Sequence, residues 1–294
     1  MMAAITLAVY GIDTCILEHT SRIGTKILQT GNGKCNFTNL NMNKSMYQNK
    51  DTQWVMDVID RFNVADTLEF FKKLGVYHKE KNGYVYPLSM TAASLQNSLR
   101  LDLENKKVRI HTDTIVKSIA INTDGDKKNF IIHCEGIDYI ADAIIIATGS
   151  KAAPKTGSDG SGYRLAETAG HTIVPPMPSL IPLVTQETWC QEAMGLSLRN
   201  VILRLYRGNK CIFEELGEML FTHFGVSGPL VLSASALMRK GSPQDYQLEI
   251  DLKSGLTPEQ LDKRIQRDLA GSPNRDLGNI LHALLPAKLI LPVL

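Results

Sequence analysis

Several common catalytic and targeting signatures are absent from this sequence. It contains no G-x-S-x-G, H-E-x-x-H or P-loop lysine motif, which excludes the usual signatures of serine hydrolases, zinc proteases and P-loop NTPases. No apolar run approaches the roughly 20 residues of a membrane-spanning helix. The first residues lack the charged segment and the cleavage site of a secretory signal peptide.

Paired cysteines and an excess of one charge are also missing. The five cysteines are scattered and form no C-x-x-C pair: Cys15, Cys35, Cys134, Cys190 and Cys211. That pattern argues against a disulfide frame or a zinc site and favours reduced thiols in the cytoplasm. The balance of 32 basic and 30 acidic residues predicts no basic face for nucleic acid or membrane. We therefore expect a cytoplasmic protein with no metal and with neither nucleic acid nor membrane as partner.

The glycine turn G-x-G-x-x-G is absent, yet the start of the chain has the pattern that normally follows it. Residues 1–9 have the apolar periodicity of a helix, Gly11 stands at the C-cap, and residues 12–17 predict a short buried strand. Glu18 ends that strand, where the acid of a dinucleotide-binding unit accepts hydrogen bonds from ribose hydroxyls. Many strands also end in a solvated Glu, so that alternative stays open.

A first glycine-rich loop, "TGNGKCNFTN", covers residues 30–39. Gly31 and Gly33 permit positive φ and close backbone approach, and the surrounding Asn and Thr side chains supply short hydrogen-bonding groups. Such a loop can wrap a flat polar cofactor. A cluster of surface turns fits the same composition.

A second loop follows the apolar run "IIIATGS". We expect residues 138–149 to form a strand, with the β-branched run at the centre of a parallel sheet. Thr148 and Gly149 would then lie at the sheet edge that binds ligands in open α/β folds. Further on, "GSDGSGYRLAE" places Gly157, Gly160 and Gly162 before a helix, whose N–H groups can meet a phosphate or flavin oxygen. A flexible loop is the alternative.

Local patterns predict the remaining elements. They indicate helices at 52–62, 63–74 with Asn63 as N-cap, and 91–106, a hairpin around Asn82-Gly83, and strands at 108–122 and 129–136. The proline-rich stretch 172–184 marks a domain crossing. Short strands then run from 181 to 252, with a helix at 229–238 among them. A helix follows, with Thr257 as its N-cap and Pro258 at its first position.

His223 is the one candidate catalytic residue. It lies in "LFTHFGVSGP", between a predicted strand and a predicted helix. A histidine there can donate a proton near neutral pH. It can equally be a structural residue that holds the loop.

Four stretches together resemble a known bacterial family. They are residues 24–39, 83–95, 144–183 and 219–235, in the family's order and spacing. The chain resembles, over essentially its whole length, the BaiN/RdsA-like (YhiN-like) NAD(P)/FAD-dependent oxidoreductases. The resemblance implies an α/β fold: an FAD-binding Rossmann-like, two-dinucleotide-binding-domain flavoprotein at 1–177, an inserted β-barrel-like domain at 178–256, and a helical part at 257–294.

The resemblance also implies a function and a set of site residues. NAD(P)H would reduce FAD, and FAD would pass a hydride to a small-molecule, organic substrate. Glu18 would hold the adenosine ribose, and Val116 would contact adenine through its backbone. The implied cofactor loops contain Lys26, Gly31, Gly33, Lys34, Cys35, Asn36, Ala147, Thr148, Gly149 and Gly162. The family often has a second Gly where Ser150 stands, and Arg where Lys34 stands. Lys is not equivalent to Arg at a bidentate site, which puts a phosphate or carboxylate clamp at Lys34 in doubt.

Two further departures concern the ends. Relatives in this family begin with a strand and a G-x-G-x-x-G turn and end with a G-E-x-x-D segment, and this sequence contains neither. We therefore expect a fragment or a truncated reading frame. The alternative function is a non-catalytic remnant that does not bind FAD productively. A flavoprotein acting on RNA is a third hypothesis, which the near-neutral charge disfavours.

Overall fold

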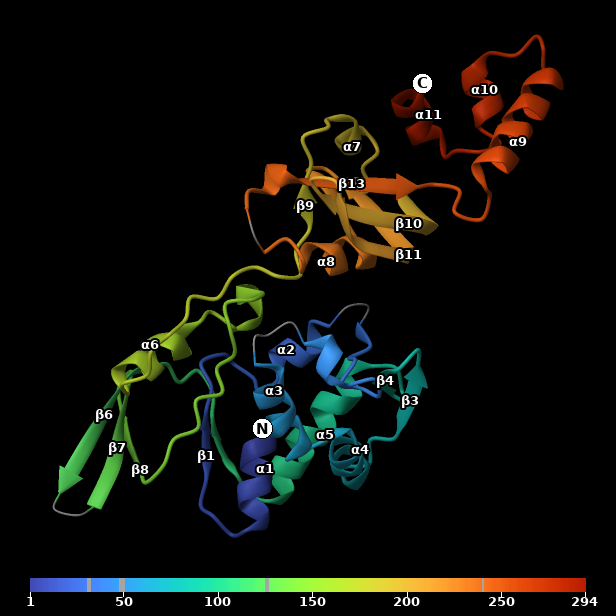
Figure 1. Cartoon of the computed structure of the whole chain (residues 1–294). Coiled ribbons are helices and arrows are strands. Elements are labelled where there is room, and N and C mark those ends of the chain that lie inside the picture. Colours follow the sequence, from blue (N-terminus) through green and yellow to red (C-terminus); the bar gives the residue numbers. More distant parts are fainter. Residues whose placement is uncertain (31–32, 48–50, 125–126, 240) are drawn as a thin grey trace. The chain divides into compact units, whose positions relative to one another are not determined.

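A computed structural model describes residues 1–30, 33–47, 51–124, 127–239 and 241–294. The chain divides into two compact units, residues 1–175 and 176–294, and each is described here by itself (Figure 1). Among the described residues, no helix is both long enough and apolar enough to cross a membrane.

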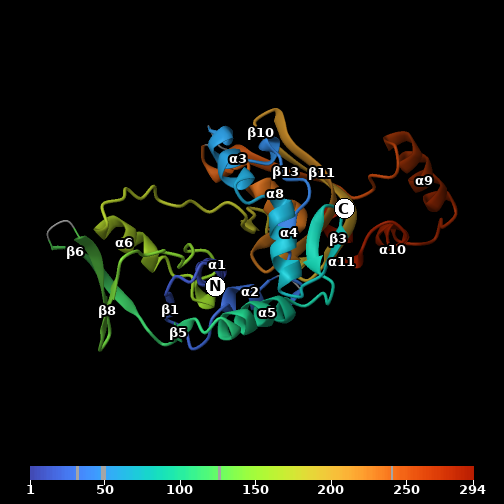
Figure 2. The ribbon, with the colours of Figure 1, turned by 90° about the horizontal axis from the view of Figure 1, so that it is seen from below.

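The first unit is built on a short parallel sheet with helices packed against it. Its core elements are β1 (Cys15–Leu17) paired with β5 (Arg109–His111), and the helices α1 (Met2–Val9), α2 (Thr25–Leu28) and α5 (Ala92–Asn105). Figures 1 and 2 show α5 beside α1 and α2. The predicted helix 91–106 is confirmed, and its expected apolar face is buried: Ala92, Leu95, Leu99 and Leu103.

A helical pair and a small antiparallel sheet complete this part of the unit. They comprise η2 (Lys44–Met46), α3 (Thr52–Asp60), α4 (Val64–Lys73), β2 (Thr38–Asn39), β3 (His78–Lys81) and β4 (Tyr84–Pro87), with strand order β2-β4-β3. Asn63 caps α4 in a reciprocal capping box with Asp66, as predicted. The hairpin turn is also confirmed, since Asn82 and Gly83 both adopt positive φ.

An antiparallel three-stranded sheet follows, of β6 (Val116–Asp124), β7 (Lys127–Cys134) and β8 (Asp138–Ala141). The predicted strand 108–122 is therefore two strands, β5 and β6. Asp113, with a φ of 52°, lies in the break between them. The unit ends with η3 (Pro154–Thr156) and α6 (Ser161–Thr168), and α6 packs near β6.

The prediction of a central parallel strand up to residue 149 is wrong. Strand β8 ends at Ala141, and among the described residues none pairs with 143–149. The side chain of Ile145 is 62% exposed. A β-branched run becomes a buried parallel strand only when hydrogen-bonded strands flank it and helices cover it. Here β1 pairs with β5 alone, so the run has the composition of a strand without its partners.

The second unit contains the predicted β-rich region as a curled antiparallel sheet. Its order is β13-β10-β11-β12-β9. The strands are β9 (Leu183–Val184), β10 (Ser197–Arg207), β11 (Lys210–Thr222), β12 (Gly225–Ser227) and β13 (Tyr246–Asp251), accompanied by α7 (Trp189–Glu192), α8 (Pro229–Ser235) and η4 (Pro243–Asp245). Its core includes Leu203, Leu205, Met219, Phe221, Val226, Leu230 and Val231.

Three helices end the chain: α9 (Pro258–Ala270), α10 (Leu277–Leu281) and α11 (Ala287–Val293). Thr257 caps α9 in a capping box with Gln260, and Pro258 occupies the first turn, as predicted. Lys288 donates from Nζ to the carbonyl of Met194, 2.6 Å away, and so ties α11 to the segment after α7.

Candidate functional site

Two loops of the first unit, which we call the 18–26 loop and the 147–162 loop, lie against each other. Thr25 Oγ1 donates to the carbonyl of Thr156 over 2.9 Å. Lys26 Nζ donates to the carbonyl of Ala152 over 2.7 Å. Glu18 and Lys26 in the first loop thus share one region with Ala147, Thr148, Gly149 and Gly162 in the second.

Glu18 directly follows β1, and its carboxylate is held by its own loop. The backbone N–H of Glu18 donates to the carbonyl of His111, which extends the β1–β5 pairing by one hydrogen bond. Oε1 accepts from both the backbone N–H and the hydroxyl of Thr20, each at 2.9 Å. Within the part of the chain that the structure describes, Oε2 accepts no hydrogen bond. The side chain is 27% exposed, so Oε2 is a free and oriented acceptor.

The β5–β6 connection, which leads to Val116, runs along the 18–26 loop. Thr114 donates its N–H to the carbonyl of Glu18, and Asp113 donates to the carbonyl of Thr20. Val116 follows two residues later, as the first residue of β6. The Glu18 residue and the backbone that leads into β6 therefore lie side by side.

The glycines of the 147–162 loop are explained by contacts inside the protein. A Cβ at position 162 would collide with Thr148 Oγ1, so Gly162 lets α6 pack on that residue. A Cβ at Gly149 would collide with Ser158 Oγ. At Gly157 it would lie 2.9 Å from Thr20 Cγ2. The glycine spacing therefore reflects close packing of the loop, and close approach to a ligand is not needed to explain it.

The first turn of α6 is already occupied by a carboxylate. Oδ1 of Asp159 accepts from the N–H of Ser161 at 2.9 Å. That backbone hydrogen bond is the main reason why the pKa of Asp159 lies below its usual range, with a smaller contribution from His19. An anion at this end would face the Asp159 carboxylate. This disfavours the phosphate expected there from the sequence.

The first glycine-rich loop is divided between surface and core. Gly31 lies outside the described residues. Gly33, Lys34 and Asn36 are exposed. Cys35 has a positive φ and is buried in the core with Ala4 and Ile5, and its N–H donates to Thr30 Oγ1. Burial raises the pKa of the Cys35 thiol, which keeps it protonated.

His223 belongs to the second unit. It lies in the turn that joins β11 to β12, exposed, with its ring 4.8 Å from that of Phe224. The glycines that follow it, Gly225 and Gly228, are required by close backbone packing. A Cβ on Gly225 would collide with the carbonyl of Leu183, and one on Gly228 would lie 2.9 Å from Met219 Cα.

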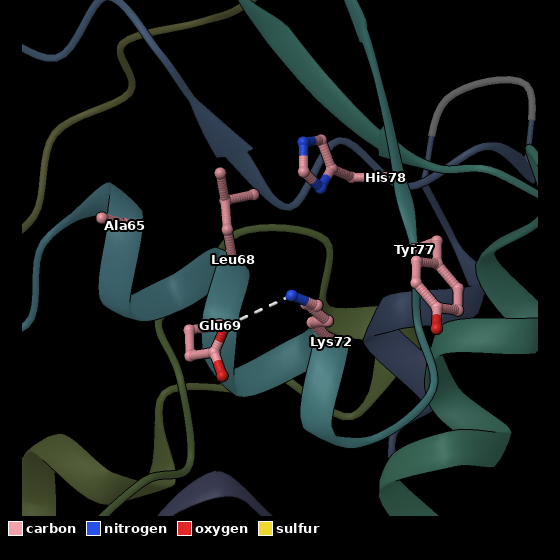
Figure 3. A pocket seen from close by; sticks show the side chains of 6 residues that line it. All are labelled: Ala65, Leu68, Glu69, Lys72, Tyr77 and His78. Carbon is pink, nitrogen blue, oxygen red and sulfur yellow. Dashed lines mark ion pairs between the residues drawn. The ribbon is translucent and has the colours of Figure 1, made fainter.

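A surface hollow of about 390 Å³ lies elsewhere in the first unit (Figure 3). Residues of α4 and the start of β3 line it: Ala65, Leu68, Glu69, Lys72, Tyr77 and His78. Lys72 pairs with Glu69 at 4.0 Å, and both side chains are largely exposed, so the pair is weak. None of these lining residues belongs to the two facing loops.

Thr20, Thr25, Thr156 and Ser158 were not predicted from the sequence, although they build the contact between the loops. Their partners are distant in the sequence: Thr25 and Thr156 are 131 positions apart. The hydroxyl of Ser158 is buried and has no hydrogen-bond partner among the described residues. The only sign of this contact in the sequence was that both loops contain Thr, Ser and Gly residues. Such a composition does not specify which residues contact one another.

Comparison with known proteins agrees with the predicted resemblance. The HI0933-like protein Rossmann domain matches residues 1–263. The chain is 35% identical over 277 residues to the 3-dehydro-bile acid delta(4,6)-reductase of Clostridium scindens, covering 94% of this chain and 66% of that protein. It is 28% identical to the ribosomal RNA dihydrouridine synthase of Haemophilus influenzae, over 99% of this chain and 70% of that protein.

The Escherichia coli ribosomal RNA dihydrouridine synthase is 27% identical, over 95% of this chain and 67% of that protein. Among solved structures, Thermovibrio ammonificans THI4 matches with a TM-score of 0.37 and 12% identity, over 79% of this chain and 73% of that one. The chain spans 66% of the length of the bile acid reductase, just under two thirds. Since the family match extends over most of the sequence, this chain belongs to the HI0933-like Rossmann-domain family.

Proposed function

We propose that this chain acts as an FAD-dependent oxidoreductase that uses NAD(P)H to reduce a carbon–carbon double bond next to a carbonyl group in a small molecule. The observation that carries the proposal is the Glu18 carboxylate, held at the end of β1 with Oε2 free. An acid in that position is the ribose-binding group of dinucleotide-binding folds. The family match supports the same assignment.

The residues present fit the adenosine part of FAD. Oε2 of Glu18 can accept from ribose hydroxyls, and the backbone two residues before Val116 is bonded to the Glu18 carbonyl. Ala147, Thr148 and Gly149, at the start of the 147–162 loop, are exposed. When bound, the flavin supplies hydride transfer, and the chain supplies position and electrostatics. Lys26 contributes by holding the carbonyl of Ala152, which keeps the two loops together.

The names of the relatives support the type of reaction. One name describes a delta(4,6)-reductase of a 3-dehydro bile acid, and two describe synthases of dihydrouridine in ribosomal RNA. In chemical terms, both kinds of name describe a reaction in which a double bond conjugated to a carbonyl group gains two hydrogens. Such a reduction needs a proton after the hydride, and His223 is the residue that we propose as its donor.

We propose a small organic molecule as the substrate, in a cytoplasmic protein. The net charge of +2 supplies little of the electrostatic attraction on which RNA binding depends. The cysteines are all free, which suits a reducing compartment. RNA as substrate is favoured by the two synthase relatives and is one outcome of the test below.

A second candidate function is a non-catalytic remnant. The unpaired segment 143–149 favours it, because a sheet without its central strand holds a cofactor less firmly. The first experiment separates the two candidates. The purified chain, with and without added FAD, is examined by visible absorbance before and after denaturation.

A flavin band that is released on denaturation is the expected result, and Glu18→Gln should weaken FAD binding. Glu215→Gln, on the exposed side of β11, is the matched control. NAD(P)H oxidation is then followed with a steroid enone and, separately, with uridine-containing RNA. A colourless chain that takes up no FAD would exclude catalysis by this chain and favour the remnant. Turnover with RNA alone would overturn the proposed substrate class.

A further inference from the structure

We infer that Thr20 is a positioning residue that couples the Glu18 carboxylate to the 147–162 loop. Its hydroxyl and backbone N–H hold one oxygen of Glu18, and its methyl group packs on Gly157. The inference rests on the proposed function in one respect, namely that Glu18 receives the ribose of a nucleotide. The coupling itself is a property of the protein without any ligand.

The Glu18 side of the coupling consists of two donors on one acceptor. The N–H and the hydroxyl of Thr20 both reach Oε1 at 2.9 Å. The hydroxyl also lies 2.8 Å from the carbonyl of Arg22, but it has one hydrogen, and the charged carboxylate is the stronger acceptor. With Oε1 engaged twice, the carboxylate has a defined orientation, and Oε2 is the oxygen available to a ligand.

The Gly157 side of the coupling is a steric contact. A Cβ at position 157 would lie 2.9 Å from Thr20 Cγ2 and 3.4 Å from His19 Nε2. Gly157 also has a φ of 91°, which a side chain rarely adopts. The carbonyl of Thr20 is fixed by the N–H of Asp113, so the threonine backbone cannot easily retreat. The methyl group of Thr20 therefore rests on the backbone of the 147–162 loop.

Two substitutions separate the hydroxyl from the methyl group. Thr20→Val keeps the methyl contact and removes the hydroxyl, while Thr20→Ser does the reverse. We expect Thr20→Val to weaken binding of ADP by about fivefold, because the Glu18 carboxylate loses one of the two hydrogen bonds that hold it in place. Binding of 2′,3′-dideoxy-ADP, which lacks the hydroxyls that reach Glu18, should change by less than about twofold. Thr20→Ser should bind ADP nearly as wild type.

A ligand-free experiment tests the steric half. Gly157→Ala should lower the melting temperature by about 2–6 °C, because the new Cβ meets Thr20 and the φ is strained. In the Thr20→Ser background the fall should be smaller by about 2 °C, since the colliding methyl is gone. In the Thr20→Val background it should be as large as in wild type. Equal falls in all three backgrounds would overturn the steric contact.

A second ligand-free cycle tests the bond to Glu18. Thr20→Val should lower the melting temperature more in wild type than in Glu18→Gln, where the charged acceptor is absent. Equal effects would overturn the positioning role, whatever the protein binds. If wild type fails to bind ADP, the proposed function fails, and the two melting cycles still decide whether Thr20 couples Glu18 to the loop.

Discussion

At the scale of single residues, the cysteines show how burial sets reactivity. Cys35 and Cys190 are buried, and burial raises the pKa of both thiols. Cys211 is exposed at the start of β11. The thiolate is the reactive form, so low access and a raised pKa both slow reaction at Cys35 and Cys190, whereas Cys211 is accessible to a reagent.

We predict that Cys211 reacts first with a thiol reagent such as Ellman's reagent in the native protein at pH 8. Cys35 and Cys190 should react only as fast as the protein unfolds. The measurement is the time course of absorbance with and without denaturant. Cys211→Ser should remove the fast phase, and its survival in that variant would contradict the assignment.

Asp159 carries a second prediction at this scale. Asp159→Ala should cost about 1 kcal/mol of stability, because the N–H of Ser161 loses its partner at the start of α6. The carboxyl pKa is lowered in the folded state, so the ionised form stabilises it. The contribution is present above the carboxyl pKa of the unfolded chain, near 4, and is lost as the pH falls through the lower folded value.

The measurement is the unfolding free energy of wild type and Asp159→Asn by denaturant at several pH values. The asparagine oxygen can still accept from Ser161, so this variant isolates the charge. The difference between the two proteins should be constant near pH 7 and shrink below pH 4. A difference that grows on acidification would refute the sign.

At the scale of elements, the run at 143–149 shows that composition does not make a strand. Its residues have high β propensity, but a strand needs partners for its N–H and C=O groups. Strand β10, by contrast, is paired on both sides, with β11 and β13. Residues of high β propensity thus form a paired strand in β10 and, at 143–149, a segment that pairs with no described strand.

We predict that the amides of residues 144–147 exchange with solvent at least about a hundredfold faster than those of 202–205 in β10. Pairing on both sides protects the amides of 202–205, whereas those of 144–147 pair with no strand that the structure describes and lie in an exposed segment. Hydrogen exchange read by mass spectrometry measures this. Equal protection would mean that the segment is paired in solution.

At the scale of the whole molecule, each unit has a core of its own. The core around Leu203 and Phe221 is drawn from residues 176–294, and the core around Leu99 and Leu103 from residues 1–175. A unit with its own apolar core can fold alone. Bonds such as Ser235 Oγ to the carbonyl of Ser179 lie within one unit.

We therefore predict that residues 176–294, expressed alone, fold and unfold cooperatively. Near-ultraviolet circular dichroism and thermal unfolding measure this, and Trp189, packed 5.5 Å from the ring of Phe221, provides a tertiary signal. Phe221→Ala, which removes a fully buried ring, should cost about 3–5 kcal/mol and abolish that signal. A non-cooperative transition of the intact segment would show that its core is incomplete.

The sequence by itself determined the features that depend on neighbours in the chain. The caps at Asn63 and Thr257, the turn at Asn82-Gly83 and the buried face of α5 all follow from residues within a few positions of one another. Glu18 was also placed correctly at the end of β1. Local sterics and periodicity are enough for such signals.

Only the tertiary structure decided the features that depend on distant partners. It left 143–149 with no neighbouring strand among the residues that the structure describes, and it placed Thr20 between Glu18 and Gly157. It also gave the glycines of the 147–162 loop a packing role. Contacts between positions more than a hundred residues apart depend on how segments pair and pack, and the local pattern of either segment does not specify its partner.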